Sequence, residues 1–183
     1  VNNYDQPLTK EKLCAWQASF FPTGFSEGSQ IEVGRYRTNE EHIVSGMFGR
    51  ERVHYIAPSP ERLEKEMAAF IEWFNKNENI SSVIRSAIAH FWFVSIHPFE
   101  DGNGRIARLL VNYILHRANY PMIIIRSDDK DKYLSVLNQC DIEVGLAPAV
   151  GASAELNQIS PFVEYMKRCL WRALDIRIRA AKG

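Results

Sequence analysis

Two strongly apolar segments, 84–96 and 106–114, are separated by a short polar turn, and together they constrain the fold more than any other feature. Within each segment apolar residues recur at helical spacing, and so few positions are polar that both helices should be largely buried. Pro98 ends the first helix, and Asn119 and Pro121 follow the second as stop signals. The pattern predicts a mainly α-helical bundle built around these two helices and the turn that joins them.

The turn lies within residues 97–108, which read His-Pro-Phe-Glu-Asp-Gly-Asn-Gly-Arg-Ile-Ala-Arg. Two glycines around an asparagine allow backbone N–H groups to point into one concavity at a helix start, where the helix dipole is positive. Arg105 and Arg108 lie three residues apart and can bind separate phosphates. Cations at this end of a helix are unfavourable without a bound anion. The stretch therefore predicts a phosphate-binding site.

Asp101 and His97 add further chemistry to this site. A carboxylate beside a cationic phosphate site is placed to hold Mg²⁺, which usually takes one or two carboxylates together with phosphate oxygens. The ordinary histidine pKa of about 6.5 leaves His97 largely unprotonated near neutrality, so it can accept a proton. Taken singly, each of these residues is more often structural. Their combination within one short stretch favours a catalytic phosphate site.

The same stretch resembles the signature of the Fic (filamentation induced by cAMP) domain family, H-P-F-x-D/E-G-N-G-R-x-x-R, and every specified position matches. The resemblance implies a Fic-type helical bundle that transfers AMP from the co-substrate ATP to a hydroxyl side chain of a target protein. It also implies that His97 is the base and that Asp101 holds Mg²⁺. The phosphates would be bound by the turn and the two arginines, namely Gly102, Asn103, Gly104, Arg105 and Arg108.

Two extended pieces, 42–45 and 53–56, predict a β-hairpin. The pattern alone fits a hairpin without a function and a functional hairpin equally well. The resemblance implies a flap over the active site that lends a strand edge to the target protein. It also implies that Ser45 and Gly46 lie near the nucleotide.

The segment 22–37 precedes this hairpin. Its first part is rich in Gly and Ser and predicts a loop, whereas residues 31–36 alternate apolar and polar side chains and predict a strand. Residues 23–28 fit the S/T-x-x-x-E-G/N letters of an inhibitory helix that many Fic proteins carry. Their Gly and Pro neighbours make a helix unfavourable, so we expect a chance match. Residues 34–37 resemble the edge of the Fic flap.

Tyr133 lies on a later helix that begins after Ser127. Its spacing with Val136 and Leu137 is typical of a core position, whereas the resemblance implies a tyrosine close to the nucleoside, and both interpretations stay open. Some members of the family have an Asn near the position of Asp141. Because this Asn is absent here, the preference for one nucleobase over another stays open.

Length and composition add few constraints. The chain is expected to be a single Fic-like catalytic domain over 1–183, with its core over about 9–174. Because it begins with Val1 in mid-sequence, we expect it to be excised from a longer chain. The formal net charge of zero gives no field that would attract nucleic acid or an anionic membrane, so neither is expected as a partner.

Three widely spaced cysteines, Cys14, Cys140 and Cys169, favour free thiols in a reducing compartment and predict a cytoplasmic protein. The expected partners are ATP and a target protein docking along the flap, and a homodimer stays open. Two alternatives remain for the function. One is phosphoryl transfer or transfer of another nucleotide on the same scaffold, and the other is a non-catalytic nucleotide-binding regulatory module. The intact motif disfavours phosphoryl transfer, and the presence of His97 disfavours the regulatory module.

Overall fold

The structure is a computed structural model that describes residues 4–45, 52–76, 79–145 and 154–182. Within these residues the chain forms helices and two small antiparallel hairpins, which we give in chain order. They are α1 (Lys10–Phe20), β1 (Phe25–Ser26), β2 (Ser29–Gln30), β3 (His42–Ser45), β4 (Arg52–Ile56), α2 (Pro60–Asn75), α3 (Ser82–Ile96), α4 (Asn103–Arg117), the 3₁₀ turn η1 (Ser127–Asp129), α5 (Lys130–Val144) and α6 (Ser160–Lys182).

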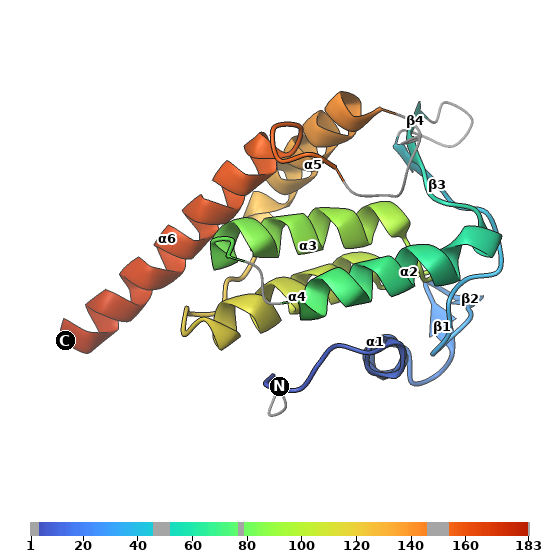
Figure 1. Ribbon diagram of the computed structural model, residues 1–183, viewed down its shortest axis with the longest axis horizontal. Helices are drawn as coiled ribbons and strands as arrows, with labels where there is room; N and C mark the ends of the chain where they lie inside the picture. Colours follow the sequence, from blue (N-terminus) through green and yellow to red (C-terminus); the bar gives the residue numbers. More distant parts are fainter. Residues whose placement is uncertain (1–3, 46–51, 77–78, 146–153, 183) are drawn as a thin grey trace.

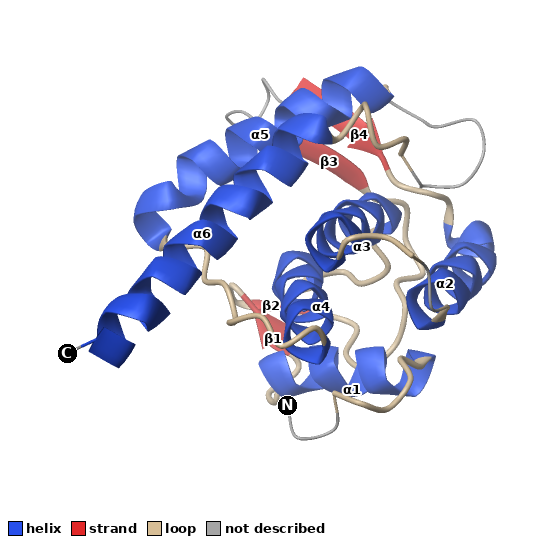
Figure 2. Cartoon of the chain, turned by 60° about the vertical axis from the view of Figure 1, so that its left-hand side comes forward, coloured by secondary structure: helices blue, strands red, loops and turns tan. Residues whose placement is uncertain are grey.

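The helices α3 and α4 form the centre of the bundle, as the two apolar segments predict (Figure 1). Helices α1 and α2 pack on one side of this pair, and α5 and α6 pack on the other (Figure 2). Phe93 of α3 belongs to the cluster shared with α2, whereas Phe91 belongs to the cluster shared with α6. Because α3 has a cluster on each side, it is apolar nearly all round. The prediction of a mainly α-helical fold is confirmed.

The predicted β-hairpin is present as β3 and β4, which pair antiparallel with an irregularity between Ile43 and Val44. Its two ends are joined at the base by a hydrogen bond from the Ala57 N–H to the Glu41 carbonyl, 3.1 Å long. The base of the hairpin lies beside the loop that joins α3 to α4, because the Arg37 side chain contacts both. The hairpin is therefore fixed next to residues 97–102.

The strand predicted over 31–36 is wrong. Strands β1 and β2 form within the segment predicted as a loop, and residues 31–41 are irregular. The physical reason is that side chains, rather than a neighbouring strand, bind the backbone of this segment. Gln17 accepts a hydrogen bond from the Gly34 N–H at 2.7 Å, and Glu100 accepts one from the Glu32 N–H, also at 2.7 Å.

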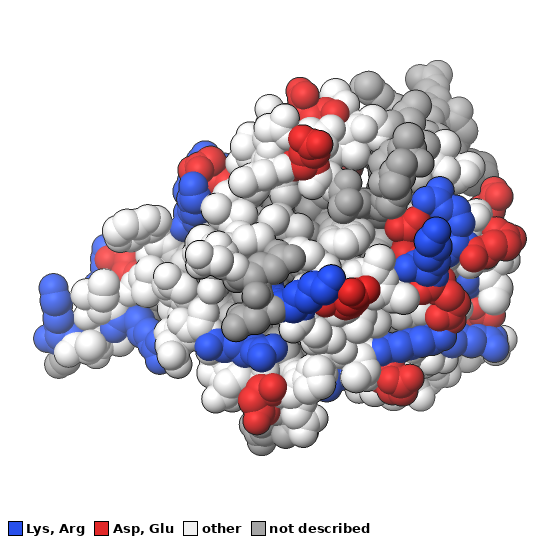
Figure 3. Space-filling model, in the orientation of Figure 1, with Lys and Arg blue, Asp and Glu red and all other residues white. Residues whose placement is uncertain are grey.

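Charges of both signs are interspersed over the face of the molecule shown in Figure 3. This mixture agrees with the formal net charge of zero. Among the helices that the structure describes, none is both long enough and apolar enough to cross a membrane.

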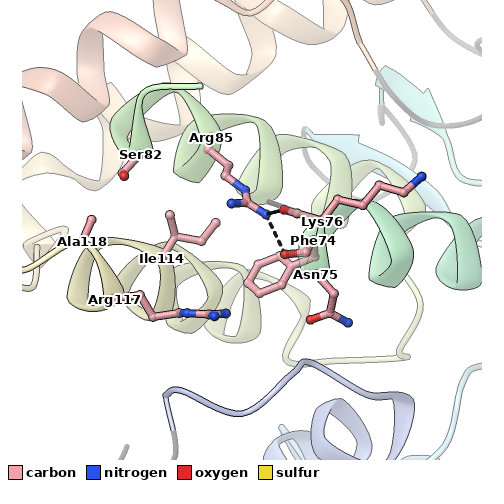
Figure 4. Close-up of a pocket in the computed structure, with 8 residues that line it drawn as sticks. All are labelled: Phe74, Asn75, Lys76, Ser82, Arg85, Ile114, Arg117 and Ala118. Atoms are coloured by element: carbon pink, nitrogen blue, oxygen red, sulfur yellow. Dashed lines mark hydrogen bonds between the residues drawn. The ribbon is translucent and has the colours of Figure 1, made fainter. Parts of the chain in front are cut away.

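A pocket of about 440 Å³ lies at the opposite end of α3 from His97 (Figure 4). It is lined by Phe74, Asn75, Lys76, Ser82, Arg85, Ile114, Arg117 and Ala118. Two of its lining cations have structural roles: Arg85 donates to the carbonyl groups of Phe74 at 2.8 Å and of Lys76, and Lys76 is paired with Glu72 at 2.8 Å. The pocket lies between the ends of α2, α3 and α4, and we assign it no chemistry.

Replacing Arg85 by Met should destabilise the fold. The substitution keeps an unbranched apolar side chain but removes both hydrogen bonds to the end of α2, and bonds from a charged donor contribute about 1–3 kcal/mol. We expect the free energy of unfolding, measured in urea, to fall by about that amount. Arg177→Met on the exposed end of α6 is the control and should change it by less than about 0.5 kcal/mol. Equal losses in both variants would contradict the assignment.

Candidate active site

His97 ends α3 in the left-handed conformation, with φ 50° and ψ 58°. Its N–H still donates to the Phe93 carbonyl at 3.1 Å, and Pro98 prevents the helix from continuing. A non-glycine residue in this conformation costs about 1–2 kcal/mol, a strain that is common at functional sites. The turn directs the chain out of α3 and into the loop that leads to α4.

The imidazole of His97 is half-buried, and its Nδ1 lies 3.1 Å from the Val94 carbonyl oxygen. Because a carbonyl oxygen can only accept, Nδ1 must carry the hydrogen of the neutral ring. The lone pair therefore lies on Nε2. This tautomer is the one that a general base at Nε2 needs.

Burial lowers the pKa of His97 to about 4. The Val94 hydrogen bond and the Asp101 carboxylate act in the opposite direction, whereas the positive charge of Arg37 lowers the pKa further. The ring is consequently neutral at pH 7. A bound polyphosphate would add negative charge nearby and raise this pKa towards neutrality, where a general base is most effective.

The buried His90 and the half-buried His97 should make the stability of the protein depend on pH. Burial lowers the pKa of His90 to about 3 and that of His97 to about 4, both below the ordinary value of about 6.5. Between pH 6.5 and 4 the unfolded chain therefore binds protons at these positions that the folded protein does not. The contribution of these two histidines to the free energy of unfolding is therefore fully present above pH 6.5 and is lost as the pH falls towards 4.

The measurement is the free energy of unfolding in urea at several pH values between 7.5 and 4.5. Each such histidine should contribute a slope approaching about 1.4 kcal/mol per pH unit below pH 6. His90→Phe keeps a ring beside Phe162, whose centroid lies 4.8 Å from that of His90, and should remove one such contribution. An unchanged slope in this variant would contradict the prediction.

The turn between the loop and α4 requires glycine at position 102, and Gly104 leaves room for a side chain that lies close to it. Gly102 has φ +89°, and a Cβ there would lie 3.1 Å from the Phe21 ring. A Cβ at Gly104 would lie 3.3 Å from Nη1 of Arg108. The Arg108 guanidinium therefore folds back over the first turn of α4, next to the backbone N–H groups predicted to bind phosphate.

Asn103 is buried and uses its whole amide group to fasten the loop. Its Oδ1 accepts from the Phe99 N–H at 3.0 Å, and its Nδ2 donates to the Phe99 carbonyl at 2.6 Å. Phe99 itself is fully buried between Phe93 and Tyr36. What Asn103 can offer a phosphate is consequently its backbone N–H, while its side chain holds the loop in shape.

Arg105 and Asp101 lie side by side and remain accessible, with exposed side-chain fractions of 40% and 42%. The guanidinium of Arg105 lies over the rings of Phe20 and Phe21 and places Nη2 3.6 Å from Oδ2 of Asp101. The Asp101 carboxylate also accepts hydrogen bonds from the Ser26 hydroxyl and from the Gly102 N–H. A cation and a carboxylate are thus available beside the turn.

Tyr133 is buried against Phe162 and Tyr165, and its hydroxyl lies 3.0 Å from Nε2 of His90. Burial raises the pKa of Tyr133, and the neighbouring Arg108 partly offsets this effect. These contacts favour the core interpretation. They also place the ring next to Arg108, so contact with a nucleotide stays a prediction.

Ser45 and Gly46 are the flap residues predicted to lie near the nucleotide. Ser45 is the last residue of β3 and pairs with Arg52, and Gly46 lies outside the described residues. Their placement near the nucleotide stays a prediction. Residues 23–28 lie in the β1–β2 hairpin, where Glu27 and Gly28 form the turn, so the inhibitor-like letters do not form a helix.

Sequence reasoning missed residues that support the site from a distance. Gln17 is fully buried on α1, and its side-chain amide lies 3.4 Å from the carbonyl groups of both Glu32 and Asp101. Arg37 is buried beneath the flap and contacts the His97 carbonyl. The signal for Gln17 was a polar residue set among apolar neighbours, and the signal for Arg37 was its place at the edge of the predicted flap, but neither reveals the partner.

In the described part of the chain, no group of three or more His, Cys, Asp or Glu could hold a metal ion by itself. A metal at this site would need further ligands from water or the substrate. Asp101 fits that requirement, because Mg²⁺ combines one or two carboxylates with phosphate oxygens.

Comparisons with known proteins show which chains this one is similar to. The profile of the Fic/DOC family matches residues 7–115, which include the whole 97–108 motif. A protein from Nematostella vectensis named "Protein adenylyltransferase Fic" is 38% identical over 147 residues, which cover 79% of this chain and 29% of that protein. A protein of the same name from Drosophila erecta is 37% identical over 144 residues, covering 75% of this chain and 26% of that protein. The chain thus spans less than a third of the length of these relatives.

Solved structures give the same result. A Fic domain containing signaling protein from Bacteroides thetaiotaomicron is 40% identical with a TM-score of 0.88, and the match covers 99% of this chain and 66% of that one. Fic-1 from C. elegans is 25% identical with a TM-score of 0.72, and the match covers 96% of this chain and 44% of that one.

Proposed function

The chain belongs to the Fic/DOC family, and on that premise we propose that it transfers AMP from ATP to a Ser, Thr or Tyr hydroxyl of a target protein, releasing pyrophosphate. Relatives named protein adenylyltransferases support this assignment. The observation that carries it is the hydrogen bond from Nδ1 of His97 to the Val94 carbonyl. It leaves Nε2 as the proton acceptor beside a turn that can bind phosphates.

His97 acts as the general base. Its Nε2 takes the proton of the attacking hydroxyl, whose oxygen forms a bond to the α-phosphorus of ATP while the bond to pyrophosphate breaks. Proton transfer of this kind typically contributes about 10²–10⁴-fold to the rate. The neutral ring at pH 7 is consistent with this role.

The turn and the two arginines bind the phosphates. The N–H groups at the start of α4 stabilise charge on the equatorial oxygens of the α-phosphate. Arg108, which lies over Gly104, and Arg105 neutralise the outer phosphates and the leaving pyrophosphate. Guanidinium groups suit this role because their paired donors match phosphate oxygens.

Asp101 would hold Mg²⁺ together with phosphate oxygens of ATP. The accessible carboxylate and the neighbouring phosphate site support this assignment. When bound, the cation would neutralise charge on the phosphates.

We also propose that the target protein docks along the β3–β4 flap and that the protein acts in the cytoplasm. The position of the flap base beside the 97–102 loop supports the first proposal. The free thiols of Cys14, Cys140 and Cys169 support the second, since reducing compartments favour free cysteines.

The test is intact-mass analysis of candidate targets after incubation with the chain, Mg²⁺ and each nucleoside triphosphate in turn. Addition of AMP from ATP supports the proposal. A phosphate adduct would indicate phosphoryl transfer instead. An adduct of another nucleotide would show that the donor is a nucleoside triphosphate other than ATP. Nucleotide binding without any adduct would identify a regulatory module.

A further inference from the structure

Arg37 is a buried arginine in the irregular segment between β2 and β3, with only 2% of its surface exposed. The described hydrogen-bond acceptors of its guanidinium are all main-chain carbonyl groups. Burying a charged side chain is costly unless its donors are satisfied. Such a residue therefore deserves a specific explanation.

One set of contacts fixes the end of α3 and the residue that follows it. The Nε of Arg37 donates to the His97 carbonyl at 2.7 Å, and Nη2 lies 3.5 Å from the Ile96 carbonyl. The Arg37 backbone N–H donates to the Pro98 carbonyl at 2.8 Å. Arg37 thus binds three successive carbonyl groups around His97, which fixes the peptide planes on both sides of this residue.

The other set of contacts fixes both ends of the flap. Nη1 donates to the Asn39 carbonyl, before β3, at 2.5 Å, and Nη2 donates to the Pro58 carbonyl, after β4, at 2.6 Å. Asn39 is tied to the loop a second time, because its Nδ2 donates to Glu100 at 3.2 Å. One guanidinium therefore joins the base of the flap to the backbone of His97.

We propose that Arg37 is a positioning residue that sets the flap and the imidazole of His97 in one fixed geometry, so that a target held on the flap presents its hydroxyl to Nε2. This inference rests on the proposed adenylyl transfer. Its structural part, the coupling of flap and loop, does not depend on the activity.

The planar guanidinium explains why an arginine occupies this position. It has five donors in a rigid fork and can reach carbonyl groups on two segments at once, whereas a lysine ammonium is a compact group on a flexible stem. Arg37→Lys keeps the positive charge but should lose the bridge. Arg37→Lys therefore tests the bridge separately from the charge, whereas Arg37→Met removes both.

The experiment compares Arg37→Lys and Arg37→Met with Arg35→Met. Arg35 lies two residues away, has 67% of its side chain exposed and pairs with Glu32 at 2.8 Å, so it is a matched control. Three quantities are measured: kcat at saturating ATP, the Kd of ATP by calorimetry, and hydrogen exchange of the amides in 42–45, 52–56 and 97–102. A thermal transition checks that each variant folds.

Arg37→Lys should bind ATP within about threefold of the parent, because the phosphate site is untouched, while kcat falls about 10²-fold through misplacement of the base and the flap. Amide exchange should become faster in the flap and in the loop together. Arg37→Met should show the same changes or larger ones. Arg35→Met should leave all three quantities unchanged.

Exchange that becomes faster in only one of the two segments, or a kcat within threefold of the parent, would overturn the proposal. Loss of a cooperative thermal transition in Arg37→Lys would also overturn it, because the residue would then serve the fold as a whole. If the parent transfers no AMP, the proposed function fails, and hydrogen exchange still decides whether Arg37 couples the flap to the loop.

Discussion

His97→Ala is expected to reduce AMP transfer by about 10²–10⁴-fold while leaving ATP binding measurable. The variant removes the only nitrogen that we assign as proton acceptor, whereas the groups that we propose to bind phosphate lie on the turn and on α4. The measurement is kcat for transfer to the target together with the Kd of ATP by calorimetry. We expect a large loss in kcat and a Kd within about threefold of the parent.

His116→Ala is the control for this variant. His116 lies in the last turn of α4, against Tyr4, and takes no part in the proposed mechanism. Its substitution should leave kcat unchanged. If His97→Ala kept most of the parental rate, another group would have to be the base.

Asn103→Ala should damage both the fold and the activity. It leaves the N–H and the carbonyl of buried Phe99 without the partners that Asn103 supplies, and each unsatisfied buried group costs about 1–3 kcal/mol. We expect the free energy of unfolding to fall by about 2–4 kcal/mol. Because the loop that carries Asp101 loses its fastening, kcat of the folded variant should also fall, by about 10²-fold.

Asn112 offers a matched control on the same helix. Its side chain makes the same pair of bonds to one backbone, accepting from the Ile123 N–H at 2.8 Å and donating to the Ile123 carbonyl at 3.0 Å. Asn112→Ala should therefore also lower stability in urea while leaving kcat of the folded protein unchanged. A similar loss of kcat in both variants would show that the effect of Asn103 comes from stability alone.

The sequence predicts the parts of the fold that depend on local patterns. The two apolar segments become α3 and α4, and the extended pieces become β3 and β4, because helical and strand periodicities are visible within a few residues. The 97–108 motif also locates the turn and its glycines correctly. These features need no knowledge of distant partners.

The prediction fails where distant side chains determine the backbone. The segment 31–36 has the alternation of a strand, yet its hydrogen bonds go to side chains such as Gln17 and Glu100. In the same way, local patterns do not reveal that the side-chain amide of Asn103 binds the backbone of Phe99, and binding of phosphate by its backbone N–H stays a prediction. Arg37 contacts a carbonyl 60 residues away, a separation that no local pattern reveals.

The contacts that shape the site join segments that are far apart in the sequence, which affects the order in which the protein folds. Gln17 and Asp101 are 84 residues apart, and Arg37 and His97 are 60 residues apart, so these contacts close long loops. Closing long loops costs more chain entropy than pairing α3 with α4, which are neighbours along the chain. We therefore expect α3 and α4 to pair before the contacts that connect His97, the loop after it and the flap are made.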